Sequence, residues 1–310
     1  MLKQSFWAIL AAASFSCMAA MVKLCNGIFG PLELVFYRSL ITTFVILCVV
    51  LTNGYSLKTT KIRGHLIRDG LGFVSVSIWF FTLGQLPLGT NITLTYTTSL
   101  FLAANFIILS LMRHFPIPWG ALFAILLGFS GILIIMQPSF ESGHLIPALL
   151  CLTVAFIDLM VYWQVRRLGK SGEPSWRIVF YFSLFCVIGT FFGVNVFEGG
   201  FTTPTPYAAF CVFVMGLFAT IGMLSSTRAW VGGNMLLVSC LGFSAIPFSE
   251  IISILFFKHE PVLEVLIGMG LIILAGILST LYTKKEEANL RRIETGEKIT
   301  PAPATEKNAK

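Results

Sequence analysis

Residues 111–118 read LMRHFPIP, and residues 256–263 read FFKHEPVL. Each segment has a histidine two residues before a proline, and the two segments lie 145 residues apart. At nearly the same offset, GPLELVFYRSL (30–40) resembles GEPSWRIVFYFSL (172–184), each with a proline just before an apolar and aromatic run. Several matches at a nearly constant offset indicate two related halves.

The composition around this repeat predicts an integral membrane protein. Of the 310 residues, 56% are hydrophobic and 11% are charged, whereas soluble proteins carry about 25% charged residues. A helix needs about 20 mostly apolar residues to cross the hydrocarbon core, and only helices or closed barrels satisfy their backbone there. The sequence predicts ten such helices, at residues 4–26, 33–53, 66–85, 89–112, 117–137, 144–165, 175–197, 206–229, 233–257 and 261–283.

Each half of the repeat then contains five helices, at residues 4–137 and 144–283. Because five is an odd number, the second half enters the membrane from the opposite face. The expected fold is therefore all-α, with ten transmembrane helices in two inverted repeats. This architecture is typical of secondary transporters with a site near the midplane between the halves. The polar tail, residues 284–310, is predicted to be disordered.

The basic residues indicate the orientation in the membrane. All of them except Lys23, Arg38 and Lys258 fall in loops or tails on one predicted side, which includes both ends of the chain. By the positive-inside rule, this side is cytoplasmic. The net charge of +7 is thus an orientation signal, not a nucleic-acid footprint. We expect a multi-pass protein of a bacterial inner membrane, monomeric or homodimeric.

Catalytic and cofactor motifs are absent from the sequence. All seven cysteines lie in predicted spans without a C-x-x-C pair, so we expect neither disulfides nor a metal site. The four histidines fall at helix ends or in loops, and there is no H-E-x-x-H, G-x-S-x-G or Walker A pattern. The sequence therefore predicts a protein that is not an enzyme and holds no cofactor.

Polar residues gather in the segment GQLPLGTNITLTYTTSLFLAANF (84–106), which leads into the fourth predicted helix. Asn91, Thr95, Thr98 and Asn105 follow helical spacing and share one face. At the 145-residue offset Asn105 falls on Glu250 of the ninth helix, where Ser249 and Ser253 lie close by. Hydroxyl residues also serve helix packing in membranes, so binding and packing both remain open for the stripe.

Charges within the predicted spans are the stronger candidates, since an ionised group near the bilayer centre usually faces a cavity or a partner. Glu250 and Asp158 could bind a substrate amine or carry a coupling proton, and each could instead pair with a base. Arg38 could bind an anionic substrate group or anchor its helix by snorkelling. An Arg38–Glu250 pair is a further alternative. Tyr162 lies one turn after Asp158, and Trp79 and Tyr96 could line an apolar cavity.

Several segments resemble the EamA family of the drug/metabolite transporter superfamily. They are VFYRSL in the second helix, GQLPLGTNITLTYTTSLF before and into the fourth, LLGFSGILIIMQP in the fifth, and HEP with GMGLIILAGIL near the end. The likeness covers nearly the whole chain before the tail. Family members often carry Gly-Glu near the end of the fourth helix, where this chain has Met112 and Arg113.

The resemblance implies a ten-helix carrier that moves a small polar metabolite, an amino acid or a drug. Alternating access of the two halves is the expected mechanism, and export is more common in the family than uptake. A lipid flippase or a channel is the other alternative. The small-molecule substrate and the lipid bilayer are the expected partners, with proton coupling through Asp158 or Glu250 as a hypothesis.

Overall fold

A computed structural model describes residues 2–25, 27–83, 85–86, 91, 94–113, 117–136, 145–257 and 263–294. All regular structure in these ranges is α-helical. The helices are α1 (Leu2–Ser5), α2 (Trp7–Leu24), α3 (Pro31–Thr52), α4 (Ile62–Leu83), α6 (Thr98–Arg113), α7 (Trp119–Met136), α8 (Leu145–Lys170), α9 (Ser175–Phe197), α10 (Pro206–Gly232), α11 (Met235–Gly242), α12 (Ala245–Phe257) and α13 (Leu263–Glu294).

Eight helical segments are long and apolar enough to cross a membrane. They include the α11–α12 segment and the helical residues from Leu94 to Met112. The two other predicted spans are also helical: the apolar part of α7 is shorter, at residues 119–135, and α4 carries Arg68 and Asp69 in its first half. The chain is therefore a multi-pass membrane protein.

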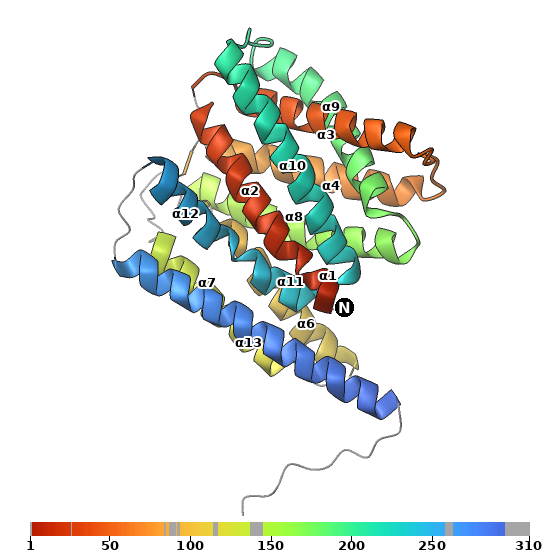
Figure 1. Cartoon of the computed structure of the whole chain (residues 1–310), viewed down its shortest axis with the longest axis vertical. Helices are drawn as coiled ribbons and strands as arrows, with labels where there is room; N and C mark the ends of the chain where they lie inside the picture. Colours follow the sequence, from red (N-terminus) through yellow and green to blue (C-terminus); the bar gives the residue numbers. More distant parts are fainter. Residues whose placement is uncertain are drawn as a thin grey trace, which may run out of the picture.

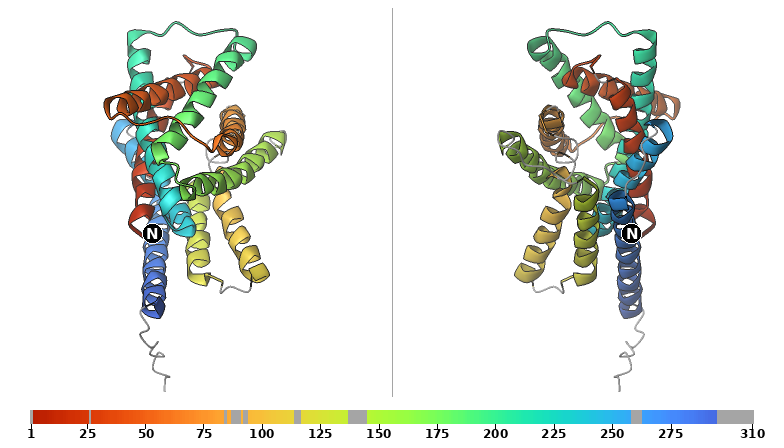
Figure 2. Two further views of the ribbon diagram at one scale, coloured as in Figure 1. Left: turned by 90° about the vertical axis from the view of Figure 1, so that its right-hand side faces the viewer. Right: turned by 90° about the vertical axis from the view of Figure 1, so that its left-hand side faces the viewer.

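The long helices pack in pairs that are distant in sequence. The most extensive contacts join α7 to α13, α2 to α10, α3 to α9 and α4 to α8. Figure 1 shows α7 and α13 side by side along one edge of the bundle, with α2 beside α10 nearer its centre. In Figure 2, α13, α6 and α7 extend beyond the other helices at one end of the molecule. Each of the four pairs joins one helix from residues 2–136 to one from residues 145–294.

The start of α3 shows how the two parts of the chain are joined at one end. The carboxylate of Glu198, which follows α9, accepts hydrogen bonds from the backbone N–H groups of Leu32 and Glu33 at 2.8 and 3.1 Å. Glu33 in turn accepts one from the N–H of Thr202 at 2.9 Å. The first N–H groups of a helix lack partners within it, and an acidic group there also complements the helix dipole.

Two boundaries differ from those predicted. The ninth span, expected as one helix at residues 233–257, is interrupted at Phe243 and Ser244. The second difference concerns the tail, which we expect to be disordered from residue 284. In the structure α13 continues to Glu294. Its sequence KKEEANLRRIE consists mainly of strong helix formers, so a helix that already exists can propagate through it.

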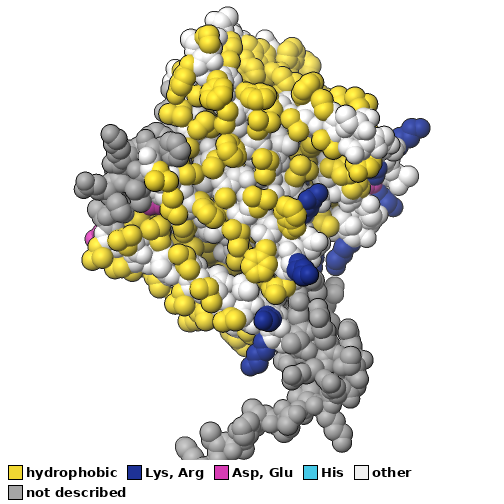
Figure 3. Space-filling view, viewed as in Figure 1, with side chains coloured by type: hydrophobic (Ala, Val, Ile, Leu, Met, Phe, Trp, Pro, Cys, Tyr) yellow, Lys and Arg dark blue, Asp and Glu magenta, His cyan; other side chains and the backbone are white. Residues whose placement is uncertain are grey.

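Exposed lysines and arginines gather at one end of the molecule, which we call the basic end. In Figure 3 they lie along the right and lower-right edge, whereas hydrophobic side chains cover most of the same face. The exposed basic residues of the described ranges are Lys3, Lys58, Lys61, Arg63, Arg167, Lys170, Arg228, Lys284 and Lys285. Arg68, expected in the loop after the second span, is instead buried within α4.

Candidate functional site

Two interrupted helices meet at the centre of the candidate site. Residues 94–96 are helical, a turn at Thr97 follows, and α6 begins at Thr98, while α11 and α12 are separated at Phe243 and Ser244. Ser239 of α11 donates to Ser99 of α6 at 2.7 Å. The rings of Tyr96 and Phe243 meet edge to face, with centroids 5.7 Å apart. Two helix interruptions therefore lie next to each other.

Helix α2 contacts α12 just after the second interruption. The Ser16 hydroxyl lies 2.8 Å from the carbonyl oxygen of Ala245, at the start of α12. Ser249 of α12 donates to the same Ser16 oxygen at 3.1 Å. Ser16, which the sequence did not single out, therefore joins α2 to α12.

Aromatic rings join α8 to α10 near the basic end. Tyr162 stacks on Trp230, with ring centroids 4.0 Å apart and ring planes 11° apart. Closer to that end, Arg166 donates to the carbonyl oxygen of Gly233 at 2.8 Å. Tyr162 also lies near Asp158 and Tyr96. Three candidates from the sequence, Tyr96, Asp158 and Tyr162, thus lie together.

Asp158 is half-buried on α8 and has a defined partner on α4. The Ser75 hydroxyl donates to its carboxylate Oδ1 at 2.5 Å. Arg68 lies on the same face of α4 as Ser75. Its positive charge interacts with the same Asp158 carboxylate. Asp158 therefore lies between polar groups of α4 and aromatic groups of α8, an arrangement that suits a cation-binding or proton-carrying carboxylate.

The polar stripe of the fourth span is largely satisfied by its own surroundings. Asn91 is fully buried and donates to Thr82 of α4 at 2.9 Å. Thr95 donates to the backbone oxygen of Asn91, and Thr98 to that of Thr95. Cys151 of α8 contacts both Asn91 and Thr95 at 3.4 Å. These contacts fasten α4 and α8 to the fourth span.

The remaining candidates are dispersed. Trp79 is half-buried and packs edge to face on Phe80, at a centroid distance of 5.1 Å. Asn105 is half-buried on α6, and its Oδ1 has no hydrogen-bond partner in the part of the chain that the structure describes. Glu250 is half-buried on α12, which packs against α2. The side chain of Ser253 lies outside the described residues.

Arg38 is buried, with only 8% of its surface exposed, so its guanidinium does not snorkel to the surface. None of the ion pairs among the described side chains joins Arg38 to Glu250. Sequence reasoning missed Arg68 and Asp69, the neighbours of Arg38, because Arg68 was counted with the loop after the second span and Asp69 was not selected. A signal was present: Arg68, Ser75, Trp79 and Thr82 recur at spacings of seven, four and three, which place them on one face of α4.

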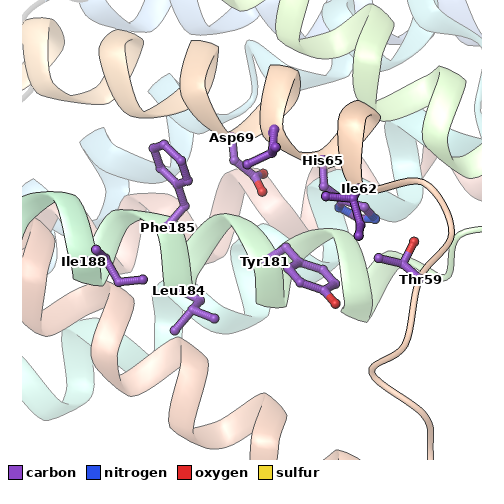
Figure 4. Close-up of a pocket in the computed structure, with 9 residues that line it drawn as sticks. Thr59, Ile62, His65, Asp69, Tyr181, Leu184, Phe185 and Ile188 are labelled. Carbon is purple, nitrogen blue, oxygen red and sulfur yellow. The ribbon is translucent and has the colours of Figure 1, made fainter.

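A groove between α4 and α9 is shown in Figure 4. Apolar side chains line most of it, including Leu184, Phe185 and Ile188, and Asp69 and His65 are buried at its wall. Ile188 is 54% exposed, so the groove opens onto the hydrophobic surface of the bundle. It lies apart from Tyr96 and Tyr162.

Loops from the two parts of the chain are joined at the basic end around Glu173. Its carboxylate accepts from Thr59 at 2.5 Å and from Arg177 at 3.0 Å, and lies 3.5 Å from His65. Burial raises the pKa of Glu173, but the hydrogen bonds from Thr59 and Arg177 and the charges of Arg177 and His65 outweigh it. The net pKa lies below its ordinary value. Glu173 is therefore an ionised link between the α3–α4 loop and the start of α9.

Comparisons with known proteins identify transporters as relatives. No family model matches the chain. It is 24% identical over 279 residues to the pseudopaline exporter CntI of Pseudomonas aeruginosa, covering 90% of this chain and 95% of the exporter. It is 21% identical over 281 residues to an S-adenosylmethionine uptake transporter of Rickettsia bellii, covering 90% and 94%. An uncharacterized transporter of Helicobacter pylori is 22% identical, with coverages of 88% and 93%.

The fold is shared with a solved crystal structure. It superimposes with a TM-score of 0.78 at 17% sequence identity, covering 92% of this chain and 97% of the other. At this identity the likeness concerns the fold alone. The chain thus shares its fold over nearly its whole length with a protein of known structure. Its named relatives in sequence include one exporter and one uptake transporter.

Proposed function

We propose that this protein is a secondary transporter of the EamA type, within the drug/metabolite transporter superfamily, that moves a small polar metabolite by alternating access. Its ten spans form two inverted repeats, residues 4–137 and 144–283. The basic end faces the cytoplasm of a bacterial cell, in line with the positive-inside rule. Export is the direction we favour, because the pseudopaline exporter has the higher identity of the two named relatives.

The observation that carries the proposal is the meeting of the two interrupted helices. At the 145-residue offset Thr97 falls on Gly242, next to the interruption at Phe243 and Ser244. Transporters with inverted repeats commonly bind their substrates where discontinuous helices of both halves meet near the midplane. The Ser99–Ser239 hydrogen bond and the Tyr96–Phe243 contact support such a site here.

Helix packing also supports the repeat. If α2 corresponds to α8, α3 to α9, α4 to α10 and α7 to α13, then α3–α9 and α7–α13 each join a helix to its counterpart. The α2–α10 contact corresponds to the α8–α4 contact. Both relations are what a pseudo-two-fold axis between the halves requires. Rocking of one half against the other would then expose the site to each side in turn.

Comparative metabolite profiling tests the proposal. Cells that express wild type, Asp158→Asn or Glu250→Gln are compared with cells that carry an empty vector, and metabolites are quantified inside the cells and in the medium. A compound lost from cells and gained in the medium only with wild type identifies an exported substrate. Accumulation inside the cells would make the protein an uptake carrier, the direction of the Rickettsia relative. No difference for any small metabolite would contradict the proposal.

The same cells test proton coupling. We expect Asp158 or Glu250 to carry the coupling proton or to bind a substrate amine, because both are acidic side chains on membrane-crossing helices. Transport is measured across a range of pH for wild type and for the two amide variants. If both variants transport normally and with unchanged pH dependence, neither carboxylate has this role.

A further inference from the structure

A second group of buried charges lies beside the candidate site, where α3, α4 and α9 meet. Arg38 of α3, Arg68 of α4 and Asp69 of α4 are 8%, 6% and 2% exposed. Both guanidinium groups lie near the thiol of Cys186 on α9 and near each other. Two arginines and one aspartate are therefore gathered in the interior of a membrane protein, where each charge needs compensation.

Arg68 has its compensation within the protein. Its Nη1 lies 3.4 Å from Oδ1 of Asp69. Its guanidinium also lies over the ring of Phe182, 3.8 Å from the centroid, a cation–π contact that is stronger away from water. The ion pair with Asp69 and the contact with Phe182 therefore explain how the charge of Arg68 is stabilised inside the protein.

Arg38 has no such compensation. Its Nε is buried and has no hydrogen-bond partner in the part of the chain that the structure describes. Burial of an arginine is costly, because its charge loses hydration that a partner must replace. Beside the Arg68–Asp69 ion pair, Arg38 is therefore a buried positive charge that no carboxylate of the described residues contacts as an ion pair.

The charge of Arg68 connects this arginine to the candidate site, since Arg68 interacts with both Arg38 and Asp158. Asp158 is half-buried and accepts a hydrogen bond from Ser75. If Asp69 compensates Arg68, the two charges left over are the positive Arg38 and the negative Asp158. A ligand that neutralises both must carry an anionic and a cationic group.

We propose that Arg38, supported by Arg68, binds a carboxylate of the transported molecule, and that Asp158 binds its cationic group. The substrate class is thus a small zwitterion that contains a carboxylate. A guanidinium presents paired N–H donors that match the two oxygens of a carboxylate. This inference rests on the proposed function, and it assigns the arginine the role of substrate anchor.

The test uses the purified full-length protein in liposomes that are loaded with the small-molecule extract of bacterial cells. Mass spectrometry identifies the compounds that wild type moves across the membrane. We expect every transported compound to contain a carboxylate and a cationic group. We also test the carboxamide of such a compound on wild type. We expect its transport to be about ten- to a hundredfold slower, because a hydrogen bond to a charged group contributes a factor of this size.

Variants supply the second measurement. Arg38→Gln is expected to lose transport by a similar factor while its thermal midpoint stays unchanged or rises, because an uncompensated buried charge is removed. Arg63 is an exposed arginine in the first turn of α4. Arg63→Gln is therefore the matched control and should transport normally. A clear fall in the thermal midpoint of Arg38→Gln would instead assign Arg38 a structural role.

The outcomes separate the two proposals. Transported compounds without a carboxylate, or a carboxamide transported as fast as its acid, would overturn the zwitterion inference and leave the transporter proposal in place. Normal transport by Arg38→Gln would also overturn the inference. If wild type moves no compound at all, the proposed function itself fails.

Discussion

Tyr162 of α8 and Trp230 of α10 are stacked almost parallel, with ring centroids 4.0 Å apart. Their helices pack against each other, and Arg166 holds the same two parts of the chain together through Gly233. The counterparts of α8 and α10 in the proposed repeat are α2 and α4, which have no comparable contact. The structure is therefore asymmetric, with α8 and α10 closed toward the basic end.

Replacement of Trp230 by alanine should open this contact. An aromatic pair contributes about 0.5–1.5 kcal/mol beyond its buried area, and truncation of a buried tryptophan adds a cavity. We expect a lower thermal midpoint in detergent and reduced transport, with partial recovery in Trp230→Phe. Trp119, which is 65% exposed, supplies the control: Trp119→Ala should change neither measurement. Equal behaviour of the two alanine variants would contradict the proposed closing role.

The hydrogen bond from Ser75 to Asp158 should matter for transport more than for stability. A hydrogen bond to a charged group contributes about 1.5–3 kcal/mol, so Ser75→Ala should reduce transport by roughly ten- to a hundredfold, measured as initial rate against substrate concentration. Ser77, on the same helix, has a buried hydroxyl without a hydrogen-bond partner in the described structure. Ser77→Ala should therefore transport like wild type. The prediction fails if the two alanine variants are indistinguishable.

The link at Glu173 predicts an acid-sensitive stability. Because the pKa of Glu173 in the folded protein is lowered, its contribution is present above the unfolded pKa of about 4.3 and is lost as pH falls through the lower folded pKa. Glu173→Gln should thus reduce the thermal midpoint at neutral pH, with the difference from wild type shrinking below about pH 4. Thermal unfolding in detergent across this range is the measurement.

Glu264 is the matched control for this acid dependence. It is exposed near the start of α13, so Glu264→Gln should leave both the midpoint and its pH profile unchanged. A constant difference between Glu173→Gln and wild type from pH 7 to about pH 3 would show that the loss does not depend on ionisation.

The contact between α7 and α13 should not tolerate a side chain at Gly268. A Cβ atom there would lie 2.7 Å from the backbone oxygen of Gly131, so the two helices would have to separate. We expect Gly268→Ala to lose about 1–3 kcal/mol of unfolding free energy, as overpacking does. Gly270, on the same helix, has no neighbour within 4 Å of an added Cβ. Gly270→Ala should be neutral or slightly stabilising, and equal losses in both variants would exclude helix contact as the cause.

The sequence by itself determined that the chain crosses the membrane many times as α-helices. Hydrophobic length is a local property, and eight predicted spans reappear as helices of sufficient length and hydropathy. The boundaries of α9, residues 175–197, agree with the prediction to the residue. The sequence also selected Asp158, Tyr162 and Tyr96, which lie close together, because charged and hydroxylated residues stand out in an apolar helix.

Only the tertiary structure decided which polar side chains have partners. Asn91 and Thr95, selected as ligands, contact α4 and α8 through Thr82 and Cys151. Arg68, counted with a loop, and Asp69, not selected, are instead buried near Arg38. Ser16, more than 200 residues away in sequence, likewise contacts the start of α12 just after the interruption at Phe243. In a membrane every polar group must find its partner inside the protein, and that partner comes from whichever helix packs beside it, not from the neighbouring sequence.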